Sequence, residues 1–189
     1  MKDKNDNKKI VDSVMTMTPR VRKFALTAHV TASVGWLGAV LGFLAHAVAG
    51  LVSKDAQIVR AAYLMMELTG WFVLVPLSFA SLITGLIQSL GTAWGLFRHY
   101  WVTVKLLITV FATIVLLTFM QGFSNLASVA VEPTLSTAEL GGHHHGAASP
   151  VVHASVAIVL LLVCVVLSVY KPWGKTRYGQ RRQNEPRIS

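Results

Sequence analysis

Four long apolar blocks constrain the fold of this chain more than any other feature of its sequence. They are Phe24–Val52, Ala61–Leu90, Tyr100–Gln121 and Pro150–Tyr170. A helix needs about 20 apolar residues to cross a hydrocarbon core about 30 Å thick, and each block is long enough. Because the runs are continuous rather than alternating, they favour helices over barrel strands. The sequence therefore predicts an all-α polytopic membrane protein, an up-down-up-down bundle of four transmembrane helices.

The overall composition agrees with a membrane protein. Hydrophobic residues make up 53% of the 189 residues and charged residues 13%, whereas about 25% of residues are charged in a soluble domain. The single cysteine, Cys164, lies in the last block, so it has no partner for an intrachain disulfide. The first block follows a long polar leader and exceeds the apolar run of a signal peptide. We therefore expect it to remain in the mature protein.

The basic residues flank the apolar blocks and predict an orientation. The formal net charge is +9, and both ends of the chain are rich in Lys and Arg. Arg98 lies in the second loop, whereas the other two loops carry only Lys54 and Arg60. The positive-inside rule places both termini in the cytoplasm of a cell-membrane protein. We thus expect a cytoplasmic basic leader (1–23), a transmembrane domain (24–174) and a cytoplasmic basic tail (175–189). Anionic headgroups explain these charges, so no nucleic-acid partner is expected.

Ionisable side chains within the spans are the candidate functional residues, because such groups are costly in a bilayer and usually face the bundle interior. At the rise of an α-helix, two lie at similar depth near the cytoplasmic end and two near the external end. The cytoplasmic pair is His29 and Lys105, and the external pair is His46 and His153; Glu67 is the one acidic residue in the spans.

A b-type haem suits these residues, since it needs only one or two axial ligands projecting into an apolar bundle. We therefore predict haem b binding with an electron-transfer or redox role, in contact with the lipid bilayer and with a redox partner or a second copy of the chain. Small residues near His46 would let a macrocycle approach, and helix contact is expected through Gly35, Gly38 and Gly42. The same pattern suits plain helix packing, in a structural protein without cofactor. The predicted cofactor-binding residues are His29, His46, Lys105 and His153.

A histidine run in the longest predicted loop, from Gly122 to Ser149, offers a second function. Imidazoles bind copper, zinc and nickel, so His143, His144 and His145 are candidate metal ligands. In this alternative, the chain handles copper or another transition metal, or assists its transport, and intramembrane side chains guide the ion inward.

Segments from all four blocks resemble known families. His29–Gly38, which places Trp36 seven residues after the histidine, resembles the first-helix signature of four-helix HemJ-type and CopD-type membrane proteins. Their later helices are matched by Pro76–Leu86, by Tyr100–Leu107 and by the ending Tyr170-Lys171-Pro172-Trp173. Over most of its length the chain is also similar to bacterial four-helix integral membrane proteins grouped as a family of unknown function.

These resemblances imply different chemistry. The HemJ-type likeness implies b-type haem and protoporphyrinogen oxidation, with the important first-helix His and third-helix Lys carried over onto His29 and Lys105. The CopD-type likeness implies copper handling in the membrane. The chain departs from the HemJ pattern because it lacks the acidic, asparagine-containing segment before the fourth helix. It departs from a copper path because it has no Met-rich or Cys-rich stretch.

Overall fold

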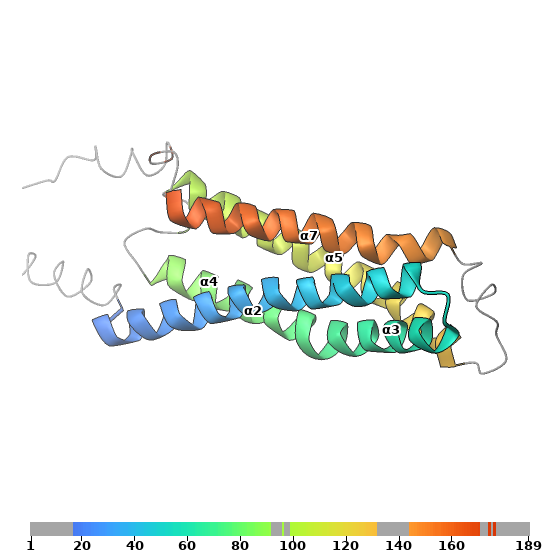
Figure 1. Ribbon diagram of the computed structural model, residues 1–189. Helices are drawn as coiled ribbons and strands as arrows, with labels where there is room; N and C mark the ends of the chain where they lie inside the picture. The colour runs from blue at the N-terminus through green and yellow to red at the C-terminus, as the bar shows by residue number, and fades with distance from the viewer. Residues whose placement is uncertain are drawn as a thin grey trace, which may run out of the picture.

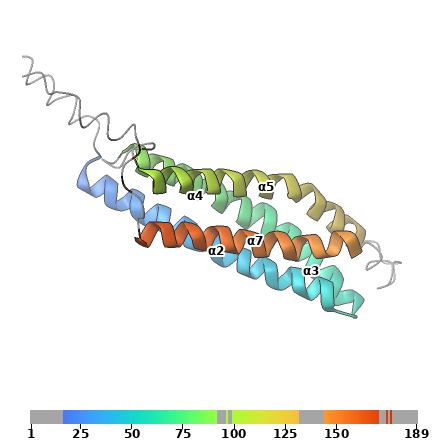
Figure 2. The same cartoon turned by 90° about the horizontal axis from the view of Figure 1, so that it is seen from above.

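The computed structural model describes residues 17–91, 96, 99–131, 144–170, 174 and 176, and these residues form an all-helical bundle. Figures 1 and 2 show the long helices lying side by side along one direction. Four spans are long and apolar enough to cross a membrane: Pro19–Val52, Ala56–Leu90, Tyr100–Asn125 and Ser149–Tyr170. The described part of the chain therefore indicates a multi-pass membrane protein.

Each predicted block lies within a longer helical segment. The helices are α2 (Pro19–Val52), α3 (Ala56–Thr69), α4 (Val75–Leu90), α5 (Tyr100–Val131) and α7 (His144–Tyr170), with a π-helical turn, η1 (Gly70–Leu74), between α3 and α4. The predicted loop from Gly122 to Ser149 is helical at both ends, since α5 ends at Val131 and α7 begins at His144. Polar residues can continue a helix beyond the hydrocarbon core, so hydropathy alone underestimates helix length. The leader before residue 17 lies outside the described residues, as does nearly all of the tail.

Local sequence explains where the first helices begin. Pro19 suits the first turn of α2, because its fixed backbone angle is helical and its missing N–H has no partner there anyway. Asp55 caps α3 by accepting a hydrogen bond from the Gln57 N–H at 2.8 Å. The Ser53 hydroxyl accepts the N–H of Asp55 at 3.1 Å, which completes the tight turn from α2 into α3.

The π-helical turn follows from a proline. Pro76 has no backbone N–H, and in a regular helix its ring clashes with the carbonyl four residues earlier. The Val75 N–H bonds instead to the carbonyl of Gly70, five residues back. This turn lets side chains separated by steps of four residues stay on the inner face. The buried residues at these steps are Met66, Gly70, Leu74 and Ser78.

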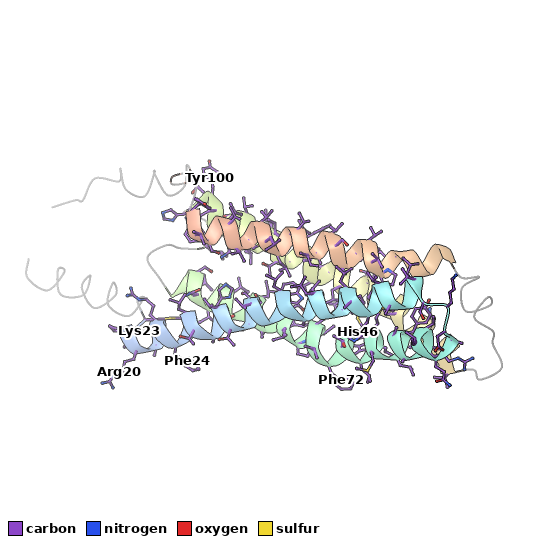
Figure 3. All side chains as sticks on the ribbon, in the orientation of Figure 1. Arg20, Lys23, Phe24, His46, Phe72 and Tyr100 are labelled. Carbon is purple, nitrogen blue, oxygen red and sulfur yellow. The ribbon has the colours of Figure 1, made fainter. Side chains whose placement is uncertain are left out.

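The bundle core is apolar, and so is much of the outer surface. Trp36 and Phe43 of α2 are buried, and the Phe43 ring lies 5.1 Å from that of Phe123 on α5. In contrast, Phe24 and Phe72 are 76% and 75% exposed, and Figure 3 shows both pointing away from the bundle. Large exposed apolar side chains all along the helices are suited to lipid contact.

Contacts between helices follow the length of the bundle. Met17 donates its N–H to the Gly91 carbonyl at 3.3 Å, and a Cβ at Gly50 would lie 2.8 Å from the Tyr63 ring. Of the three glycines expected at helix contacts, Gly35 is confirmed, because a Cβ there would lie 3.7 Å from Leu77. Gly38 and Gly42 are exposed, and no described atom would lie within 4 Å of a Cβ at either. That part of the prediction is wrong, because a side chain at either position would face open space among the described residues.

Candidate functional site

The candidate residues and the side chains that contact them are grouped into two layers by their depth along the helices. One, which we call the His29 layer, comprises His29, Ser33, Ser81, Thr84, Lys105 and Ser168. The other, which we call the His153 layer, comprises His46, Glu67, Phe119 and His153. His46 follows His29 by seventeen residues on α2, about 25 Å at the helical rise. His153 precedes Ser168 by fifteen residues on α7, about 22 Å. Because α2 and α7 are continuous helices, the two layers lie well apart.

His29 is anchored across the bundle to α4. Its Nδ1 lies 3.2 Å from the Ser81 carbonyl oxygen and 3.1 Å from Thr84 Oγ1. The Thr84 hydroxyl donates to the Ala80 carbonyl at 2.6 Å, so its oxygen accepts from His29. Both partners are acceptors, and we therefore assign the ring proton to Nδ1. Nε2 keeps its lone pair.

Small residues on α4 make room for this ring. A Cβ at Gly85 would lie 3.1 Å from His29 Cε1, closer than most Cβ contacts. One turn earlier, the buried Ser81 hydroxyl meets that of Ser33 at 2.9 Å. These polar contacts explain why α4, in an otherwise apolar span, carries hydroxyl groups on its inner face.

Lys105 belongs to the same layer and joins α5 to α7. Its Nζ donates to Ser168 Oγ at 2.6 Å, and the Ser168 hydroxyl donates to the Cys164 carbonyl at 2.8 Å. Nζ also lies 5.9 Å from the centre of the Trp101 ring, within the range of a cation–π contact. His29 thus joins α2 to α4, whereas Lys105 joins α5 to α7.

The described carboxylates lie far from this charge. Among the described residues they are Asp55, at the start of α3, and Glu67, near its end. Glu67 precedes Thr84 by seventeen residues, about 25 Å at the helical rise. Within the described part of the chain, Lys105 therefore has only neutral hydrogen-bond partners.

His153 satisfies one ring nitrogen within its own helix. Its Nδ1 lies 2.6 Å from the Ser149 carbonyl oxygen, one turn back on α7, and 3.1 Å from the Ser149 hydroxyl. The carbonyl can only accept, so Nδ1 carries the proton and Nε2 keeps its lone pair. The ring packs against Phe119 of α5, with 3.6 Å between ring centres. Its orientation is therefore fixed by both a hydrogen bond and packing.

His46 differs from the other two histidines. Its Nδ1 is buried and has no hydrogen-bond partner. An enclosed polar atom without a partner costs about 1–3 kcal/mol, so native structures seldom contain one without a reason. Figure 3 shows His46 on α2, toward the end opposite Arg20 and Lys23.

The structure describes the predicted metal ligands only in part. His143 lies outside the described residues. His144 and His145 begin α7, but their side chains are not described. In the described part of the chain, no three His, Cys, Asp or Glu side chains converge to hold a metal ion. His46, His153 and Glu67 thus do not form a chelating group.

The sequence prediction missed the hydroxyl partners of the candidate residues. Their signal was available in part, because Ser78, Ser81 and Ser89 share the buried face of α4. The partners Ser168 and Ser149 lie one helical turn from Cys164 and His153, but nothing in their spacing indicates which helix they face.

Comparison with known proteins assigns no role to these residues. A scan against protein-family models, a search of the curated proteins and a search of the solved structures found no match to this chain. A functional assignment therefore depends on the two layers themselves.

Proposed function

We propose that this chain is an up-down-up-down four-helix protein of the cell membrane that binds b-type haem in an electron-transfer or redox role. The topology is supported by contacts of Met17 with Gly91 near one end of α2 and of Gly50 with Tyr63 near the other. A cytoplasmic N-terminus is supported by the exposed Arg20 and Lys23 at the start of α2.

The hydrogen bond from His153 Nδ1 to the Ser149 carbonyl carries the haem proposal. Imidazoles that ligate metals nearly always donate their other ring N–H to a carbonyl, a carboxylate or water, which fixes the tautomer and the ring orientation. His153 has this arrangement, and Phe119 holds its ring from one side. Its Nε2 is the nitrogen that would ligate iron.

His46 is the second residue that fits. Its helix α2 packs against α7, and both histidines belong to the His153 layer. Because its buried Nδ1 has no partner, the hydrogen bonding of the His46 ring is incomplete. Turning the ring so that Nδ1 donates to the carbonyl of Gly42, one turn back, would repeat the arrangement of His153 and free Nε2 for a ligand.

A macrocycle suits this layer better than a bare ion. A transition-metal ion in a protein usually needs three or more side-chain ligands, and the described residues offer no such group. Haem supplies four nitrogens of its own, so one or two imidazoles complete its coordination. When bound, haem supplies a one-electron ferric–ferrous couple. The chain would contribute imidazole nitrogens of His46 and His153, a fixed orientation of the His153 ring and an apolar surrounding that influences the potential.

The HemJ-type resemblance supports a different placement, at His29 with Lys105. His29 also has a protonated Nδ1 and a free Nε2. We favour the His153 layer because His29 already serves to join α2 to α4, whereas the unpartnered His46 has no such role. Single substitutions separate the two placements.

The test is the visible spectrum of detergent-purified protein, oxidised and dithionite-reduced, with a pyridine haemochrome assay for haem per chain. The wild-type chain should show a Soret band and sharp reduced α and β bands. His153→Ala and His46→Ala should lose or shift them, and His99→Ala, an imidazole outside both layers, should not. A change in His29→Ala alone would move the haem to the other layer. A colourless protein after haem supplementation would reject the proposal and favour a structural role for the histidines.

A further inference from the structure

The start of α2 carries three cations within four residues. The side chains of Arg20, Arg22 and Lys23 are exposed, and none has a hydrogen-bond or ion-pair partner among the described residues. The described carboxylates belong to α3, because Asp55 caps this helix and Glu67 lies near its end. Asp55 follows all 34 residues of α2, about 51 Å at the helical rise. Within the described part of the chain, no anion therefore balances the charge at this end of the bundle.

The position of these cations on the helix is unfavourable without an anion nearby. The start of a helix is the positive end of its dipole, so it repels basic side chains. Arg20 and Lys23, three residues apart, also repel each other. The first turn of α2 contains no acidic residue, and its N-cap, Thr18, makes no side-chain hydrogen bond to the helix. An anionic group bound at this surface would offset the repulsion.

Exposed apolar side chains lie among the cations. Val21 is 50% exposed and Phe24 is 76% exposed, and Figure 3 shows Phe24 beside Arg20 and Lys23 at the start of α2. Figures 1 and 2 show that α2 starts beyond the ends of α4 and α7. A membrane surface places charged headgroups next to hydrocarbon, so it matches both kinds of side chain. An acidic protein surface would match the charges alone.

We propose that the start of α2 binds the anionic headgroups of membrane phospholipids. This surface, the α2 basic turn, comprises residues 20–24. Guanidinium and ammonium groups form charge-assisted hydrogen bonds to phosphate oxygens, and an anionic lipid adds a net charge that a zwitterionic lipid lacks. Val21 and Phe24 contact the adjoining acyl chains. The Met17 N–H, bonded to the Gly91 carbonyl at 3.3 Å, holds the preceding residues beside α4. The proposal does not depend on haem binding.

The experiment measures which lipids contact the protein. The full chain is reconstituted in phosphatidylcholine vesicles with a trace of nitroxide-labelled phosphatidylglycerol or nitroxide-labelled phosphatidylcholine in both leaflets. Electron paramagnetic resonance gives the fraction of labelled lipid whose motion the protein restricts. We expect about threefold stronger association of phosphatidylglycerol, because one basic side chain favours an anionic headgroup about fivefold and the spectrum averages over all contacting lipids. Equal association of the two lipids would overturn the proposal without any variant.

Salt tests the electrostatic origin of this preference in the unaltered chain. The Debye length falls from about 10 Å at 0.1 M salt to about 3 Å at 1 M. The preference for phosphatidylglycerol should therefore fall to about 1.5-fold or less at 1 M. A preference that salt leaves unchanged would have another origin, and the proposal would be wrong.

Substitutions then locate the preference. The first variant combines Arg20→Gln, Arg22→Gln and Lys23→Gln. The matched control removes the same charge after α7 and combines Lys171→Gln, Lys175→Gln and Arg177→Gln. The first variant should reduce the preference to about 1.5-fold or less, whereas the control should keep it at about twofold or more. If the first variant keeps the preference, or if the control loses as much of it, the α2 basic turn is not the lipid-binding surface and the proposal is rejected.

Discussion

The two intramembrane layers use their histidines in opposite ways. In the His29 layer, polar groups bond across helices: His29 joins α2 to α4, and Lys105 joins α5 to α7. In the His153 layer, His153 bonds only to its own helix, and His46 Nδ1 has no partner. The first layer contributes to holding the bundle together, whereas the second leaves hydrogen-bonding capacity that a ligand could use. Stability and ligand binding should therefore respond differently to changes in the two layers.

The largest expected effect comes from His46. In haem-free protein, His46→Leu should raise the free energy of unfolding by about 1–3 kcal/mol, because it removes a buried polar atom without a partner. The measurement is unfolding in mixed micelles followed by circular dichroism. Ala45→Leu, at an exposed neighbour on α2, controls for added apolar surface and should change little. Destabilisation by His46→Leu would contradict the distinction between the layers.

The next comparison replaces each anchored histidine by an aromatic ring of similar size. His29→Phe removes bonds between helices and should lower the free energy of unfolding by about 1 kcal/mol. His153→Phe removes only a bond within α7 and should cost less than about 0.5 kcal/mol in haem-free protein. The same micelle unfolding assay applies to both. Equal losses would show that the bonds across helices have no special structural role.

The smallest effect tests the space around His29. Gly85→Ala places a Cβ 3.1 Å from His29 Cε1, so the ring must move by a few tenths of an ångström. We expect a loss of up to about 1 kcal/mol, typical of mild overpacking. Gly38→Ala meets no described atom within 4 Å, so it controls for the gain in helix propensity from Gly to Ala and should not lower stability. If Gly85→Ala were equally neutral, the ring would not be held as tightly as its contacts indicate.

Hydropathy predicted the four helical spans, because lipid imposes a long apolar run on each. It did not predict that α5 continues to Val131 or that η1 interrupts the second span. Helix ends beyond the hydrocarbon core depend on local backbone contacts. The π-helical turn depends on how Pro76 is accommodated among neighbouring helices.

The candidate site was predicted less completely than the fold. Depth along the spans predicts that His29 and Lys105 lie at a similar level, because rise per residue is regular; their separate partners on α4 and α7 were not predicted. Residue spacing does not show how each helix is rotated about its own axis against its neighbours. Gly38 and Gly42 were therefore wrongly expected at helix contacts. For the same reason, neither the Ser81 and Ser168 partners nor the unpartnered state of His46 could be read from spacing.

The π-helical turn lets the two halves of the second span present different kinds of side chain to the core. Before it, α3 presents Tyr63 and Met66 to the core; after it, α4 presents Ser78 and Ser81. An uninterrupted helix of this length would carry one continuous inward stripe, and removing a residue would rotate everything beyond it by about 100°. The wider turn at Gly70–Leu74 changes the direction in which the side chains after it point, relative to those before it. A half with buried hydroxyl groups can thus follow an apolar half, while the inner side chains of both stay directed at the core.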